Sequence, residues 1–161
     1  MKTEILFPEV ANLCGDLMNV TYLRQCCPEM EVVETGLKDR PAFLDGGVDL
    51  VYVGSATERG LQLMVQALTP YKAELERYVD GGGLMLATGN ALDALGEYVV
   101  IDGKRAFDGL GLLATHAEYH MLKRHSSFFL GKFQDMDIVG FKSLFGHSHG
   151  MGEALFDTTL Q

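Results

Sequence analysis

The chemistry open to this sequence depends on the corner Thr88-Gly89-Asn90, which follows the apolar run LMLA at residues 84–87. In many α/β enzymes, a turn between a strand and the next helix carries the nucleophile of the reaction. This turn offers a hydroxyl, a glycine and an amide, but no thiol. A second corner, GSATER at residues 54–59, follows the apolar run that ends at Val53. Both corners are candidate ligand sites.

Small residues at both corners allow backbone N–H groups to face a ligand, and the helix that follows each corner presents the partial positive charge of its N-terminus. An anion or a developing oxyanion would be stabilised there. Neither corner contains a GxGxxG motif or a P-loop, so no nucleotide cofactor is expected. The candidate binding residues are Gly54, Ser55, Ala56, Arg59, Asn90 and Ala91.

The cysteines are weaker candidates for chemistry. There are three, Cys14, Cys26 and Cys27, and an odd number with two adjacent is typical of free thiols and not of a disulfide framework. Cys14 follows the first expected strand and would need a lowered pKa to act as a nucleophile.

The histidines leave a metal site as an alternative to ordinary surface residues. His116 and His120 would share one face if their segment were helical, and His147 and His149 could supply two more nitrogens. However, no Asp, Glu or Cys lies at a standard ligand spacing beside them. We therefore expect no metal and no other cofactor.

The spacing of apolar residues predicts alternating strands and helices in the first hundred residues. Asp16 is expected to cap the first helix. Pro70 is expected to open a new helix within the long amphipathic segment 58–79. The apolar composition of residues 48–53 and 84–87 predicts that both are buried strands. The other expected elements are strands at residues 4–7 and 31–35 and helices at residues 16–27 and 91–95.

This order of elements indicates a three-layer α/β fold with a mostly parallel central sheet and helices on both faces. Residues 127–130 and 138–141 are expected to form antiparallel or edge strands. A chain of 161 residues can bury about two thirds of its unfolded surface in one core. We therefore expect residues 1–161 to form a single domain.

Charge and hydropathy exclude several classes of protein. The net charge of -9 and the pI near 4.9 argue against nucleic-acid binding, which needs clustered Lys and Arg. The N-terminus lacks the apolar core of a signal peptide, and no stretch is long and apolar enough to span a membrane. We therefore expect a cytoplasmic protein.

Four short motifs occur in a recognisable order. Residues 12–16, NLCGD, with Asn19 resemble an NLYGDxGN opening, and residues 54–59 resemble a GGGxDRE turn. Residues 108–113, DGLGLL, resemble EGLGLLD, and residues 138–141, IVGF, resemble the start of IVGFENHGGRT. These motifs resemble the CobB/CobQ-like class I glutamine amidotransferases, above all the glutaminase subunit of lipid II isoglutaminyl synthase. The resemblance covers nearly the whole chain and implies their three-layer, flavodoxin-like fold, with an oxyanion hole between the two corners.

The catalytic positions of that family are not kept. Its nucleophilic Cys aligns with Gly89, and Thr88 beside it should point to the opposite face of the strand. Lys142, Ser143 and Leu144 stand where the family has Glu, Asn and His. Its catalytic His lies in a later TYLHG-like motif, which this sequence does not reach. The resemblance thus implies a degenerate homologue, or a fragment that is short at its C-terminus and leaves an edge strand exposed.

The resemblance implies two alternative functions. In the first, the chain is a non-catalytic glutamine amidotransferase-like subunit, without catalytic residues, that binds glutamine or another small polar molecule. It would then assist a Mur-ligase-like amide synthetase in amidating a cell-wall peptidoglycan precursor. In the second, it is an active amidotransferase subunit of the lipid II isoglutaminyl synthase or cobyric acid synthase type. That enzyme would supply ammonia by hydrolysing glutamine with another nucleophile, or would use free ammonia within its complex.

Overall fold

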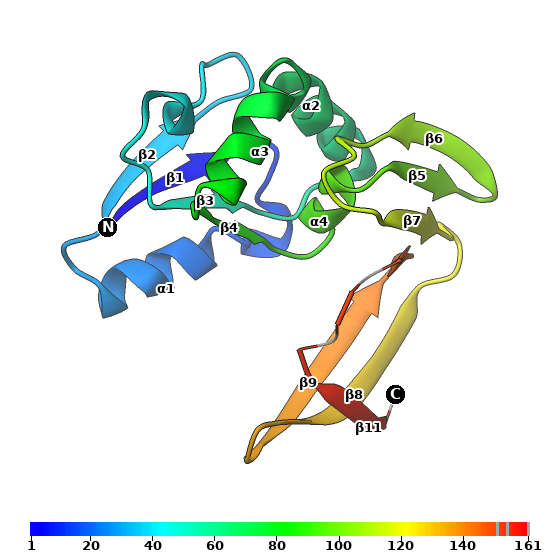
Figure 1. Cartoon of the computed structure of the whole chain (residues 1–161). Helices are drawn as coiled ribbons and strands as arrows, with labels where there is room; N and C mark the ends of the chain where they lie inside the picture. The colour runs from blue at the N-terminus through cyan, green and yellow to red at the C-terminus, as the bar shows by residue number, and fades with distance from the viewer. Residues whose placement is uncertain (151, 154, 161) are drawn as a thin grey trace.

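A parallel sheet of four strands lies at the centre of the N-terminal part of the molecule (Figure 1). The computed structural model describes residues 1–150, 152–153 and 155–160. The strand order is β2-β1-β3-β4, and each neighbouring pair is parallel. These strands are β1 (Lys2–Leu6), β2 (Glu31–Thr35), β3 (Leu50–Val53) and β4 (Leu84–Ala87).

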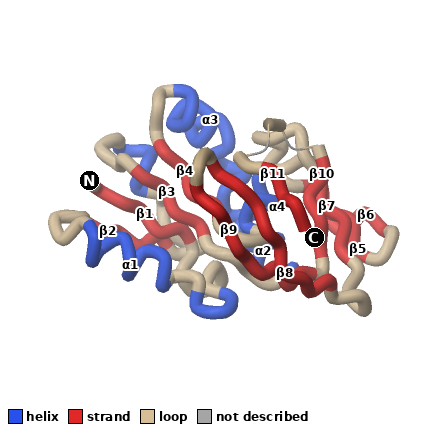
Figure 2. Tube along the Cα trace, turned by 90° about the horizontal axis from the view of Figure 1, so that it is seen from below, coloured by secondary structure: helices blue, strands red, loops and turns tan. Residues whose placement is uncertain are grey.

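Helices cover both faces of this sheet, which confirms the predicted three-layer α/β fold. On one face, Val20 of α1 (Met18–Cys26) packs in a small core with Ile5 and Tyr52. The opposite face is covered by α2 (Glu58–Leu68) and α3 (Lys72–Asp80), whose apolar residues share the larger core with β1 and β3. Figure 2 shows α1 on the near side of the sheet. No helix in the described residues is long and apolar enough to cross a membrane.

Local sequence signals explain where the helices begin. The Thr57 side chain caps α2 by accepting a hydrogen bond from the backbone N–H of Gly60 at 3.1 Å. Pro70 lies in the 3-10 turn Thr69–Tyr71, so the predicted division of segment 58–79 into two helices is confirmed. The short helix α4 (Ala91–Leu95) follows the corner at Gly89.

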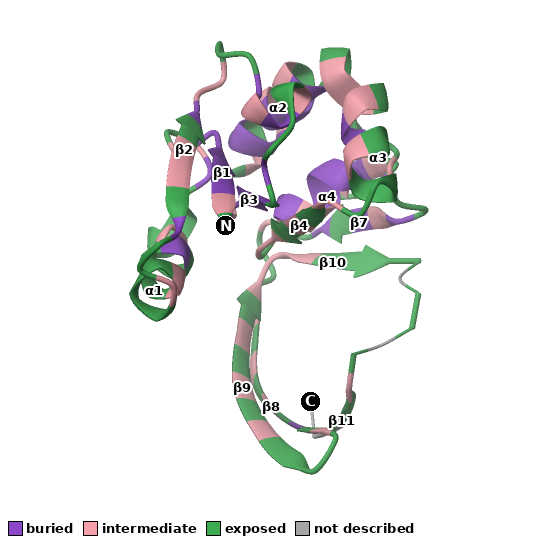
Figure 3. Ribbon diagram, turned by 60° about the vertical axis from the view of Figure 1, so that its left-hand side comes forward, coloured by how far each residue is buried: buried purple, intermediate pink, exposed green. Residues whose placement is uncertain are grey.

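The second half of the chain forms two further sheets. One is mixed, with the order β10-β7-β5-β6, and the other is antiparallel, with the order β11-β8-β9. The β8–β9 hairpin projects from the body of the molecule (Figures 1 and 3). It contains both segments that the sequence predicts as antiparallel or edge strands. The strands are β5 (Tyr98–Ile101), β6 (Lys104–Asp108), β7 (His116–Tyr119), β8 (His125–Phe133), β9 (Met136–Leu144), β10 (Gly146–His149) and β11 (Asp157–Leu160).

Two predicted local features are wrong. The composition of residues 84–87 predicts a buried strand, yet β4 is the edge of its sheet and Leu84 is 62% exposed. The reason is that α1 packs on β1 and β3 and leaves this side of β4 bare. Asp16 does not cap α1, because the N-cap position is Leu17 and no side-chain cap bond forms. The Asp16 carboxylate instead serves the candidate site.

Candidate functional site

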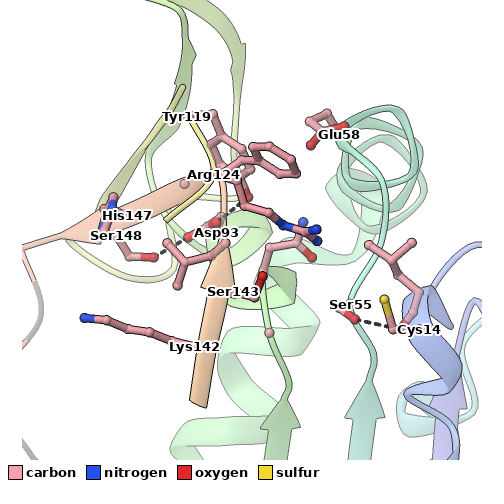
Figure 4. Close-up of a pocket in the computed structure, with 16 residues that line it drawn as sticks. Cys14, Ser55, Glu58, Asp93, Tyr119, Arg124, Lys142, Ser143, His147 and Ser148 are labelled. Atoms are coloured by element: carbon pink, nitrogen blue, oxygen red, sulfur yellow. Dashed lines mark hydrogen bonds between the residues drawn. The ribbon is translucent and has the colours of Figure 1, made fainter. Parts of the chain in front are cut away.

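A pocket of about 520 Å³ opens at the carboxyl ends of β3 and β4 (Figure 4). Ligands in open α/β sheets bind at this end of the strands. Ser55 after β3 and Gly89 and Asn90 after β4 form its floor, so the two predicted corners do meet in one pocket. The opposite wall is built from the end of β9 and the start of β10.

Gly89 adopts a backbone conformation that would be strained for a residue with a side chain. Its φ is +54°, in the left-handed region that favours glycine. A Cβ built on Gly89 would lie 2.8 Å from the Cβ of Ser55, closer than two carbon atoms can approach. Position 89 therefore carries no nucleophilic atom, and it has no room for a side chain while Ser55 stays in place.

Asp16 connects the corner after β3 to the corner after β4. The backbone N–H of Ser55 donates to Asp16 Oδ2 at 2.6 Å, and the Thr88 hydroxyl donates to the same oxygen at 2.6 Å. Asn19 Nδ2 donates to Oδ1 at 2.8 Å. Burial alone would raise the pKa of Asp16, but the hydrogen bonds from Thr88, Ser55 and Asn19 together lower it below its ordinary value of 3.8. Asp16 is therefore ionised, and its carboxylate holds the two corners together through hydrogen bonds.

Asn90 makes a second link between the corners. The backbone N–H of Ala56 donates to Asn90 Oδ1 at 2.9 Å, and Asn90 Nδ2 donates to the Ala56 carbonyl at 2.8 Å. The N–H groups of Ser55 and Ala56 thus have acceptors inside the protein, as does that of Ala91, which donates to the Thr88 carbonyl. An oxyanion in the pocket would have to compete with these acceptors.

The predicted binding residues divide into two groups. Ser55 and Asn90 line the pocket, whereas Gly54, Ala56 and Ala91 are buried beneath it. A Cβ at Gly54 would lie 2.2 Å from the Ala11 carbonyl oxygen, so this position requires glycine for close packing. Arg59 does not line the pocket. A binding role for the six residues stays a prediction.

Asp93 connects α4 to the mixed sheet at the back of the pocket. It is 7% exposed, and its two oxygens accept hydrogen bonds of 2.6 Å from the Tyr119 hydroxyl and from the Ser148 hydroxyl. Burial, together with the Asp93 carboxylate, raises the pKa of Tyr119 well above its ordinary value, so the phenol remains a donor. Sequence reasoning missed this trio, because its members lie on three elements far apart in the chain.

Charges of both signs face the pocket. Arg124 lies with its guanidinium 5.1 Å from the centre of the Phe145 ring, and Lys142 lies on the β9 side. Glu58 lies in the first turn of α2. Arg124 belongs to the basic triplet at residues 123–125, whose sequence alone favours a solvated turn, and only the fold of the second half brings it to the site.

Cys14 shares the pocket with the Gly89 corner, although it comes from a different strand end. Its φ is +59° and its side chain is exposed. Figure 4 places Cys14 and His147 on opposite sides of the pocket. Partial burial, with His125 and Lys142 nearby, lowers the pKa of His147 below its ordinary value of 6.5. Cys14, Cys26 and Cys27 are all free thiols.

The helical spacing considered for His116 and His120 is wrong, because His116 begins strand β7 and His120 follows its end. His116 instead stacks between Tyr98, with ring centres 4.9 Å apart, and His149, with ring centres 5.2 Å apart. Within the described ranges, no three His, Cys, Asp or Glu residues are placed to hold a metal ion.

Comparison with known proteins gives a likeness of fold. No protein-family model matches the sequence, and no curated protein matches it. A similar solved structure is described as the crystal structure of a glutamine amidotransferase. The TM-score is 0.55 at 13% identity, over 93% of this chain and 75% of that chain. This chain therefore has a glutamine amidotransferase-like fold.

Proposed function

We propose that this chain is a non-catalytic glutamine amidotransferase-like protein that binds glutamine or another small polar molecule without hydrolysing it. The observation that carries this proposal is Gly89, which has no side chain and leaves no room for one. The motif resemblance aligns this position with the nucleophilic Cys of the amidotransferases. Glutamine hydrolysis requires a thiolate to attack the side-chain amide carbon, forming a thioester and releasing ammonia, before water releases glutamate. Glycine cannot form that bond.

The charges of the pocket favour a zwitterionic amino acid as the ligand. Arg124 can bind an α-carboxylate and Glu58 an α-ammonium group, and both line the same pocket. Ser55 and Asn90 also line this pocket, and their polar side chains can bind the side-chain amide of glutamine. Calorimetric titration with L-glutamine tests this arrangement, and no measurable heat of binding would contradict it.

A pair of variants separates binding in the pocket from general charge. Arg124→Met should weaken glutamine binding about tenfold or more, because a hydrogen bond to a charged group contributes about 1.5–3 kcal/mol. Lys123→Met removes the neighbouring cation, which does not line the pocket, and should leave the affinity unchanged. Equal effects of the two variants would contradict the proposed pocket.

The second candidate function is glutamine hydrolysis by Cys14, and its position in the same pocket favours it. The assay is glutamate release from glutamine, with and without a thiol-alkylating reagent. We expect no release from the wild-type protein. Release that is lost both on alkylation and in Cys14→Ser would establish this second function and overturn the first.

We further propose that the protein works with a Mur-ligase-like amide synthetase on a cell-wall precursor. The motif resemblance at residues 12–16, 54–59, 108–113 and 138–141 supports this partner. Affinity purification of the tagged chain, co-expressed with a Mur-ligase-like amide synthetase from the same genome, tests the proposal. Recovery of the chain without the synthetase would contradict it.

A further inference from the structure

The β8–β9 hairpin presents an apolar face to solvent. Phe128 lies opposite Phe141, and Leu130 lies opposite Val139, in the antiparallel register. Phe128, Phe141 and Val139 are 68%, 58% and 71% exposed. The other face of the hairpin carries Phe129, which stacks on Phe156. Four neighbouring apolar side chains on a solvent face indicate an interaction surface.

The same hairpin also has an open edge. In the order β11-β8-β9, one side of β8 is already paired with β11, and β9 is the edge strand among the described residues. β9 runs for nine residues, Met136–Leu144, without proline. Natural edge strands are protected by charges, prolines or bulges, yet the centre of β9, residues 138–141, reads Ile-Val-Gly-Phe. Its backbone is therefore able to pair with another strand.

The charge of the hairpin favours a second copy of the same chain as the occupant. Residues 125–144 contain two Lys and two Asp, so the hairpin is neutral although the whole chain carries -9. Two copies can thus meet at their hairpins while the acidic bodies stay apart. A hairpin without net charge offers no electrostatic attraction to a strongly acidic or basic partner.

The sequence of β9 is also self-complementary about Gly140. If two β9 strands pair antiparallel with the Gly140 residues opposite each other, Val139 of each copy lies opposite Phe141 of the other. Asp137 then lies opposite Ser143, so no like charges meet. A two-fold interface needs this kind of reciprocal match, and pairs of aromatic and β-branched residues stabilise antiparallel strands.

We propose that two copies of this chain associate through β9, pairing edge to edge about Gly140 into one six-stranded sheet. This interface is centred on Gly140 and is inferred independently of ligand binding, although Lys142, Ser143 and Leu144 at the end of β9 also line the pocket. Main-chain hydrogen bonds between the strands provide the affinity, and the Val139–Phe141 contacts fix the register.

Sedimentation velocity across a wide range of protein concentration tests the association. We expect a reversible monomer–dimer equilibrium, with amide hydrogen exchange in β9 slowing as the dimer forms. A monomer at every concentration, or β9 exchange that does not depend on concentration, would overturn the proposal.

Matched variants distinguish pairing through the β9 edge from packing of the apolar hairpin faces. Val139→Lys places like charges diagonally across the two-fold axis and should weaken the dimer about tenfold or more. Phe128→Lys adds the same charge to the same apolar face but on the inner strand β8, and it should leave the dimer intact. Dissociation by Phe128→Lys alone, or equal weakening by both variants, would show that the faces pack together and would overturn edge pairing.

A mixing experiment tests the register. Val139→Lys and Phe141→Glu should each be mainly monomeric, because each places two like charges across the axis. Mixing the two variants should restore a dimer, since the introduced lysine of one copy then lies opposite the introduced glutamate of the other. A mixture that stays monomeric would overturn the register centred on Gly140. Circular dichroism confirms that each variant is folded.

Discussion

At the scale of single residues, the left-handed backbone of Gly89 limits what can replace it. Gly89→Cys should destabilise the fold by more than the roughly 1–2 kcal/mol that a left-handed conformation costs an ordinary residue, because the new Cβ also meets Ser55 at 2.8 Å. Urea unfolding measures the loss. We expect no glutaminase activity from this variant.

Two further variants separate strain from steric contact. Gly103 has a φ of +78° with nothing within 4 Å of an added Cβ, so Gly103→Cys carries the backbone cost alone. Gly89→Cys combined with Ser55→Gly should lose stability by an amount close to that of Gly103→Cys. If Gly89→Cys alone already matches Gly103→Cys, Ser55 does not obstruct the corner.

Asp16 gives the fold a pH dependence whose sign follows from its lowered pKa. A carboxylate with a depressed pKa stabilises the folded state above its ordinary value of 3.8, and this contribution is lost as the pH falls through the lower, folded-state pKa. Asp16→Asn should therefore cost about 1–2 kcal/mol at neutral pH, and the difference from wild type should shrink below about pH 4.

A surface carboxylate provides the control for Asp16. Asp45 forms an exposed ion pair with Arg40 at 2.6 Å, with its side chain 70% exposed. Asp45→Asn should change the stability by less than about 1 kcal/mol. A difference between wild type and Asp16→Asn that stays constant as the pH falls well below the ordinary Asp value would contradict an ionised Asp16 in the folded state.

At the scale of elements, Asp93 ties α4 to β10. Ser148→Ala leaves one buried oxygen of Asp93 without its partner and should cost about 1–3 kcal/mol. Hydrogen exchange in residues 146–149 should accelerate, because this bond joins β10 to the body. Ser126→Ala removes an exposed hydroxyl that bonds to Ser143 at 3.1 Å, and its effect should be within about 0.5 kcal/mol. Similar losses in the two variants would contradict a tie at Asp93.

Element type was predictable from local patterns, whereas burial depended on neighbours. The run at residues 48–53 and the Pro70 break carry their signals within a few residues, and strand β3 and helix α3 lie where those signals put them. The run at residues 84–87 has the same apolar composition as β3, but β4 has no strand on its outer side among the described residues. Composition cannot distinguish an edge strand from a central one.

At the scale of the whole molecule, only the two corners of the site could be predicted, because each has small residues directly after an apolar strand. The two corners meet because the carboxyl ends of parallel strands share one edge of a sheet. Ser148 reaches the same pocket through the pairing of β7 with β10, and Arg124 reaches it from the segment between β7 and β8. That pairing joins segments far apart in the chain, and no local sequence motif predicts it.

The net charge of -9 predicts how salt affects association. If two copies meet at neutral hairpins, repulsion between their acidic bodies opposes the dimer, and added salt screens it, since the Debye length falls from about 30 Å at 0.01 M to about 10 Å at 0.1 M. The dimer dissociation constant, measured by sedimentation, should therefore fall as sodium chloride rises. In the mixture of Val139→Lys with Phe141→Glu, the dissociation constant should fall less with salt, because salt also screens the attraction between the introduced lysine and glutamate. Weakening of the wild-type dimer by salt would mean that attractive charge pairs hold the copies together, which a neutral β9 edge cannot provide.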